Sequence, residues 1–117
     1  MRGKYILLAV CLALASLSCD SIKQLNQRVL YQKASTAHDE QNFDKAISLY
    51  REFLASEPNN ALVNYDLGVA YTQKKDFSRA EAQIGKLKKL GRADLADQLL
   101  QVMEKARHRE QMMRPSS

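Results

Sequence analysis

The side chains that could do chemistry are few and scattered along the 117-residue chain. The two histidines, His38 and His108, lie far apart in the sequence, and no zinc-ligand spacing, phosphate-binding glycine loop or nucleophile motif accompanies either one. Asp94 and Asp97 form an acidic pair, but they lie near the expected start of a helix, where carboxylates stabilise the helix dipole. The sequence therefore predicts a protein that is not an enzyme and that uses no metal and no cofactor.

Cys19 is the one residue whose setting points to a modification. It follows an apolar run from Tyr5 to Leu17 that has a basic start and is shorter than the ~20 apolar residues of a membrane-spanning helix. This layout is typical of a secretory signal segment. Cys11 lies inside the run, so removal of the segment would leave Cys19 as the only thiol of an exported protein.

The residues before Cys19 resemble the end of a bacterial lipobox, at which a signal is cut before a cysteine that receives lipid. Ser18 fits that pattern, whereas Ser16 and Leu17 depart from its usual form. The resemblance implies cleavage after residue 18, lipidation of Cys19 and export to the cell envelope as a membrane-anchored lipoprotein, since more than one acyl chain gives stable anchoring. Asp20 leaves the choice between inner and outer membrane open.

Two alternatives remain at this end of the chain. The residues Ala13-x-Ala15 fit an ordinary signal-peptidase cut, which would release a soluble protein that starts at Ser16. The segment could also stay uncut and serve as a membrane anchor. The three outcomes differ in the first residue of the mature chain.

The charge distribution gives no indication of a nucleic-acid partner. The formal net charge is +5, and Arg2 and Lys4 would leave with the signal. Residues 19–60 then carry five Lys/Arg against six Asp/Glu, and residues 61–117 carry eleven against seven. Because no aromatic residues interleave with the basic ones, we interpret the basic C-terminal half as a solvated surface.

A repeat of 34 residues organises the rest of the chain. Small residues recur at this offset, as Ala34 with Gly68 and Ala46 with Ala80, and so do Phe43 and Phe77. Small side chains let two helices cross closely, and aromatic side chains fill the space around the crossing. The positions that carry the repeat are Ala34, Ala46, Tyr50, Pro58, Leu67, Gly68, Tyr71, Ala80 and Ile84.

This pattern resembles the tetratricopeptide repeat (TPR), with its Leu-Gly-x2-Tyr and Ala-x3-aromatic signatures and a proline at the junction. The resemblance implies an all-α solenoid of helical hairpins. We expect two repeats and a C-terminal capping helix after the N-terminal signal segment. In residue numbers these are a signal at 1–18, an anchor and very short linker at 19–21, repeats at 22–60 and 61–91, a cap at 92–110 and a frayed tail at 111–117.

Apolar periodicity and capping residues predict where the five helices begin and end. The expected helices are Ser21–Gln41, Asp44–Ser56, Ala61–Gln73, Phe77–Leu90 and Ala93–Arg109. The first begins about two turns before a standard repeat would, and its extra residues are expected to cover the end of the array.

In TPR proteins the first helix of each hairpin lines a concave groove that holds a segment of a partner protein. By matching turns, the resemblance assigns this groove to Arg28, Tyr31, Ser35, His38, Asp39, Leu62, Tyr65, Val69, Thr72 and Gln73. The set that some TPR cochaperones use to clamp a terminal carboxylate is absent, because the corresponding places hold Tyr31, Ser35 and Asp66. Tyr31 and Tyr65 have the alternative of packing within their hairpins.

The resemblance implies a non-enzymatic adaptor or scaffold that binds a protein or peptide, anchored in the bacterial envelope and acting in envelope or secretion-machinery assembly. Two alternatives remain open. One is a soluble exported TPR protein that binds a peptide or carries a substrate. The other is a homo-oligomer, since two repeats are fewer than the ~3 that a self-sufficient array needs.

Overall fold

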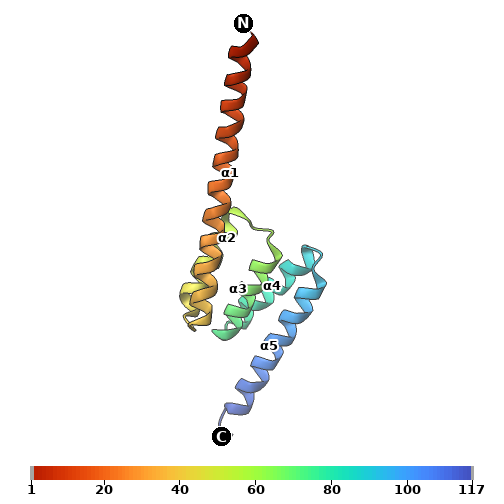
Figure 1. Ribbon diagram of the computed structural model, residues 1–117. Coiled ribbons are helices and arrows are strands. Elements are labelled where there is room, and N and C mark those ends of the chain that lie inside the picture. Colours follow the sequence, from red (N-terminus) through yellow and green to blue (C-terminus); the bar gives the residue numbers. More distant parts are fainter. Residues whose placement is uncertain (1, 117) are drawn as a thin grey trace.

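Five α-helices follow one another along residues 2–116, and α3 lies at their centre (Figure 1). The computed structural model describes residues 2–116, except for the side chains of residues 2, 4 and 13–18. α3 packs against α2, α4 and α5, while α1 packs against α2. The predicted all-α arrangement of helical hairpins is confirmed. The helices are α1 (Arg2–Asp39), α2 (Phe43–Ser56), α3 (Ala61–Gln73), α4 (Phe77–Lys89) and α5 (Ala93–Met113).

The small residues of the 34-residue repeat lie at the helix crossings. Ala34, Ala46 and Ala80 are each 0% exposed, so no room remains around them for a larger side chain. The aliphatic and aromatic members of the repeat, Tyr50 and Ile84 among them, complete the same core. Burial of this continuous apolar surface is the main source of stability, since helices of 13 or 14 residues are marginal alone.

α1 is much longer than the predicted helix, because it begins at Arg2 instead of Ser21. No glycine or proline occurs between residues 5 and 39, so nothing in the sequence interrupts the helix. Among the described side chains, the first buried one is that of Gln27, and the part of α1 before it projects from the domain (Figure 1). This projection gives the molecule a longest dimension of 88 Å. The predicted cleavage sites at residues 13–18 lie outside the described side chains.

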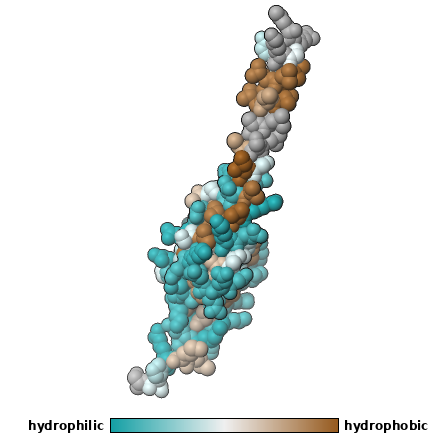
Figure 2. All heavy atoms as spheres, turned by 60° about the vertical axis from the view of Figure 1, so that its left-hand side comes forward, coloured by the Kyte–Doolittle hydropathy of each residue, from teal (hydrophilic) through white to brown (hydrophobic). Residues whose placement is uncertain are grey.

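None of the helices in the described part of the chain is both long enough and apolar enough to cross a membrane. In the described part of the projection, the apolar side chains are exposed, from Tyr5 at 76% to Val10 at 49%. Figure 2 shows the aliphatic ones in brown, above a body that is largely hydrophilic.

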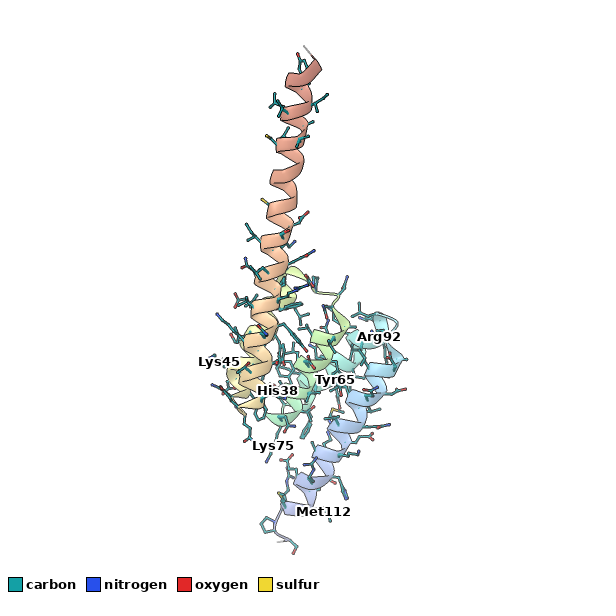
Figure 3. All side chains as sticks on the ribbon, viewed as in Figure 1. His38, Lys45, Tyr65, Lys75, Arg92 and Met112 are labelled. Atoms are coloured by element: carbon teal, nitrogen blue, oxygen red, sulfur yellow. The ribbon has the colours of Figure 1, made fainter. Side chains whose placement is uncertain are left out.

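α5 extends beyond its predicted end at Arg109 and includes the first residues of the expected frayed tail. Glu110 forms an ion pair with Arg114 at 3.7 Å across the last turn. Arg114 itself is extended, as a residue before proline must be, and Pro115 therefore ends the helix. Met112 and Met113 are largely exposed at this end of α5 (Figure 3).

The same C-terminal cap closes three of the helices. After α1, α3 and α4, a residue with positive φ directs two backbone N–H groups back to the last turn, as in a Schellman motif. Gly91 fills this place after α4, with φ of +74°, as predicted. Gln41 and Lys75, which are 34 residues apart, fill it after α1 and α3 with φ of 60° and 62°. An L side chain is strained in this conformation.

We therefore predict that Gln41→Gly and Lys75→Gly each raise the free energy of unfolding by about 0.5–1 kcal/mol. The relief of left-handed strain exceeds the extra backbone entropy of glycine in the unfolded chain. Gly91→Ala is the matched control and should lower stability by about 1 kcal/mol. Chemical denaturation followed by far-UV circular dichroism measures all three. A loss of stability in both Gln41→Gly and Lys75→Gly would show that these two residues are not strained in the left-handed conformation.

Candidate functional site

A direct hydrogen bond joins the first helices of the two hairpins. The Tyr31 hydroxyl of α1 donates to Oδ2 of Asp66 on α3 at 2.9 Å. The Tyr31 ring also packs against the rings of Tyr50 and Phe53 on α2, with centroids 6.3 and 6.4 Å away. The Tyr31 ring thus packs within its hairpin, which is one of the two roles considered from the sequence, and its hydroxyl is bonded to the second repeat.

The environment of this bond shifts the pKa of each partner upward. Burial, followed by the hydrogen bond to Asp66, raises the pKa of Tyr31 to about 12. Burial also raises the pKa of Asp66, against the opposing effects of the Tyr31 hydrogen bond and of nearby His38. The pKa of Tyr50 is raised by burial first and then by the carboxylate of Asp66. The Tyr31 hydrogen bond and His38 therefore offset only part of the cost of burying the charged Asp66 carboxylate.

His38 lies at the lower end of the same face, on α1 (Figure 3). Its ring makes edge-to-face contacts with Phe43 at 5.4 Å and Tyr50 at 6.3 Å between centroids. The side chain is half-buried instead of fully exposed. These contacts give His38 a packing role and place it on the aromatic wall that α1 and α2 share.

Five of the ten predicted groove residues line one of two hollows. Arg28, Tyr31 and Leu62 line a hollow of about 760 Å³ between α1 and the start of α3. Thr72 and Gln73 line a smaller one of about 200 Å³ against α5. The remaining predicted positions line neither of these hollows. Of these, Asp39 is exposed. The other four are half-buried: Ser35, His38, Tyr65 and Val69.

Thr72 differs from the prediction that it offers its side chain to a partner. It is 2% exposed, and its Oγ1 atom donates to the carbonyl oxygen of Gly68 at 2.9 Å. The hydroxyl is thereby satisfied within its own helix, as threonine often achieves by bonding four residues back. Its place in the groove is structural.

Two polar residues of this region were not singled out from the sequence. Asn64 is 1% exposed, and its amide donates to the carbonyl oxygens of Pro58 and Asn60 at 3.0 and 2.8 Å, which fastens the α2–α3 turn. Gln27 is 7% exposed and donates to Ser56. Both residues are polar at positions where the helical periodicity expects a core residue. That mismatch could have identified them from the sequence, since a buried amide must find hydrogen-bond partners.

Apart from His38, the residues considered for chemistry lie away from this face. His108 is exposed on α5. Asp94 accepts two hydrogen bonds from the Arg92 guanidinium, at 3.0 and 2.9 Å, and these lower its pKa to about 2. Within the described residues, no group of His, Cys, Asp or Glu side chains is arranged to hold a metal ion. Cys19 is exposed on the projecting part of α1, and about 12 Å of helix separates it from Gln27.

The burial of Asp66 predicts a specific pH dependence. Because its folded pKa is raised, the unfolded chain releases this proton first, and stability is lost as pH rises through the window above the ordinary value of 3.8. Asp66→Asn keeps an acceptor for Tyr31 and removes the titration. We expect the free energy of unfolding of the wild type, taken relative to that of Asp66→Asn, to be lower at pH 6 than at pH 3.5. Urea denaturation at both pH values measures this difference. A relative stability that rises over this interval would contradict the assignment.

Comparison with known proteins gives one match. A family model described as tetratricopeptide repeat matches residues 37–101, more than half of the chain. The match runs from the last turn of α1 into α5 and leaves the rest of α1 outside it. No curated protein and no solved structure matches the chain significantly.

Proposed function

Because the chain belongs to the tetratricopeptide repeat family, whose repeats serve as protein-interaction modules, we propose that it is a non-enzymatic adaptor. In this proposal it is anchored in the bacterial cell envelope through lipidated Cys19 and acts in envelope or secretion-machinery assembly. The observation that carries the binding role is the face that α1 and α3 share, where Tyr31 is bonded to Asp66. The half-buried Tyr65, labelled in Figure 3, lies on α3 beside Asp66.

This face suits a peptide or helix of a partner protein. It combines aromatic surface with acceptors, since the Asp66 carboxylate uses one oxygen for Tyr31 and exposed Asp39 lies at the end of α1. Side chains of this kind bind extended or helical segments by pairing apolar contacts with a few directed hydrogen bonds. The family's repeats are generally non-catalytic.

The anchoring proposal rests on the apolar run before Cys19 and on the exposure of that cysteine. Since α1 is continuous from Cys19 to Gln27, a lipid on Cys19 would hold the domain about 12 Å from the headgroups on a stiff rod. A stiff, short spacer restricts the partners to proteins that reach the membrane surface.

Binding is tested by co-purification of partners with the variant Asp39→Arg plus Tyr65→Ala. We expect these changes to remove partners that the wild type retains. The control is Arg51→Ala plus Glu52→Arg, at exposed positions on α2, which should retain them. Retention by both variants would exclude the shared face of α1 and α3 as the binding site.

Anchoring is tested by mass spectrometry of the mature N-terminal peptide. An acylated Cys19 is the expected result, and an unmodified N-terminus at Ser16 would show a soluble exported protein instead. Light scattering of the purified chain tests the remaining alternative, self-association, which predicts a mass that rises with concentration.

A further inference from the structure

The projecting part of α1 carries an apolar stripe that continues onto the folded domain. Ile22 and Leu25 are each 60% exposed, and Val29 is 40% exposed. These three residues, here named the α1 stripe, are spaced by three and four positions and therefore lie on one face of the helix. The stripe is visible in Figure 2 as brown side chains that descend along α1 onto the hydrophilic body. It lies outside the residues that match the repeat family.

The α1 stripe borders the larger hollow. Leu25 and Val29 line the hollow of about 760 Å³, together with Phe53 and with Leu62, which is 53% exposed on α3. Apolar side chains from three helices therefore converge on one concave surface. Large apolar residues gathered in this way on a soluble domain mark an interaction site more often than isolated ones do.

A buried polar atom in the wall of this hollow lacks a partner. Gln27 donates its amide hydrogen to Ser56, whose own hydroxyl donates to the carbonyl oxygen of Phe53. Since the single hydroxyl hydrogen of Ser56 is used there, Gln27 must be the donor, and its Oε1 is left as the free acceptor. Within the described residues this oxygen is buried without a hydrogen bond. Buried acceptors are normally paired, so this oxygen is an uncompensated polar atom behind the surface of the hollow.

The charges around the α1 stripe are almost all positive. Lys23, Arg28 and Lys33 are exposed on α1, and the helix has no acidic residue between Asp20 and Asp39. None of the three basic side chains takes part in an ion pair with the described residues. Glu57, on the α2–α3 turn, is the one carboxylate that lines the hollow. A partner surface with acidic flanks would complement this arrangement.

We propose that the α1 stripe, with Leu62, binds an amphipathic helix of a partner protein that carries acidic residues on both sides of its apolar face. This inference rests on the proposed function as an interaction module and adds a surface and a partner class to it. The apolar face of that helix covers Ile22, Leu25 and Val29, and its acidic flanks meet Arg28 and Lys33.

Two other occupants fit less well. In a side-by-side pair of α1 helices from two copies, Arg28 of one copy would face Lys33 or Arg28 of the other, and like charges at these flanking positions oppose pairing. A lipid bilayer supplies anionic headgroups, but its flat surface cannot fill a hollow between α1 and α3. A helix satisfies the apolar, concave and cationic features together.

The test measures binding of two synthetic helical peptides to the full chain in zwitterionic nanodiscs by fluorescence anisotropy. Both peptides carry leucines at the spacing of the stripe; one has glutamates on its flanks and the other has lysines. We expect the acidic peptide to bind at least about tenfold more tightly. Leu25→Ser plus Val29→Ser should weaken its binding about tenfold or more, and Arg28→Glu plus Lys33→Glu should reverse the preference.

The matched control is Lys88→Glu plus Lys89→Glu, which makes the same change in net charge at exposed positions on α4 and should leave the preference intact. Equal binding of the two peptides would overturn the proposal. Self-association of the full chain in detergent would also overturn it, if the Leu25→Ser plus Val29→Ser variant no longer self-associates. Adsorption of the full chain to anionic nanodiscs that this variant loses would do the same. Circular dichroism confirms that these exposed substitutions keep the fold.

The same variants separate this inference from the proposed function. If the Leu25→Ser plus Val29→Ser variant still captures the cellular partners that Asp39→Arg plus Tyr65→Ala loses, the stripe proposal fails and the adaptor function stands. If the acidic peptide binds as expected but the wild type captures no protein in cells, the adaptor function fails while the chemistry of the stripe holds.

Discussion

Leu99→Ala is expected to lower the free energy of unfolding by about 2–5 kcal/mol, the range for a leucine deleted from a packed core. Leu99 lies on α5, is 0% exposed and is among the largest fully buried side chains. Its methyl groups pack where Gly68 of α3 leaves room. Small domains have a total stability of about 5–15 kcal/mol, so this one change would remove a large share. Denaturant unfolding followed by far-UV circular dichroism measures it.

The control is Leu62→Ala, at a leucine that is 53% exposed and outside the buried cluster. Its expected effect is within about 0.5 kcal/mol, as for most surface substitutions. If Leu99→Ala cost no more than Leu62→Ala, α5 could not share the core of the repeats. The chain would then consist of two hairpins with a loosely attached fifth helix.

The positions of the small residues could be predicted from the sequence because they reflect a local requirement. Each close crossing within a hairpin needs a side chain no larger than alanine at a fixed distance from the turn, and the 34-residue offset repeats that distance. Ala46 and Ala80 are accordingly both 0% exposed. The turns repeat as well, since Asn42 and Asp76 cap α2 and α4 with their side chains. The fold was predictable because the small residues and the helix caps, which are both local features, indicate the same helix boundaries.

Contacts between helices that are not neighbours in sequence were less predictable. The pattern assigned Gly68 to the crossing with α4, and Gln83 of α4 is indeed 3.2 Å from where its Cβ would lie. The tightest neighbour, however, is Leu99 of α5, at 2.3 Å. The registry of α5 against α3 depends on how both pack on α4, and apolar periodicity carries no information about that registry.

The candidate site was predictable only as a set of positions. Turn matching placed Tyr31 on the correct face, but its bond to Asp66 depends on the distance between two helices that belong to different hairpins. Thr72 was assigned to the surface because its backbone position faces the groove, whereas its hydroxyl turned to its own helix. The α1 stripe was expected to cover the end of the array, and it is exposed in the structure because α2 ends at Ser56, level with Gln27.

Gly68→Ala is expected to destabilise the fold by up to about 2 kcal/mol, although alanine is the better helix former. A methyl group at this position would lie 2.3 and 3.1 Å from the two Leu99 methyl groups and 3.2 Å from Cβ of Gln83. Leu99 has no exposed surface to move into, so the overpacking should cost about 1–3 kcal/mol. The gain in helix propensity, about 1 kcal/mol, offsets only part of that cost.

Gly85→Ala is the matched control, because Gly85 is also helical but has no heavy atom within 4 Å of the added methyl group. It should raise stability by about 0.5–1 kcal/mol. Equal gains from both glycine substitutions would show that α5 does not press against α3 at Gly68.

The double variant Gly68→Ala plus Leu99→Ala isolates the contact itself. The cavity left by Leu99 would accommodate the new methyl group, so its loss of stability should be smaller than the sum of the two single losses by about 1 kcal/mol or more. If the two single losses of stability simply added, the cost of Gly68→Ala would not come from its contact with Leu99. Since α5 packs against both α3 and α4, the coupling energy measures how tightly the fifth helix packs on the α3 side of the array.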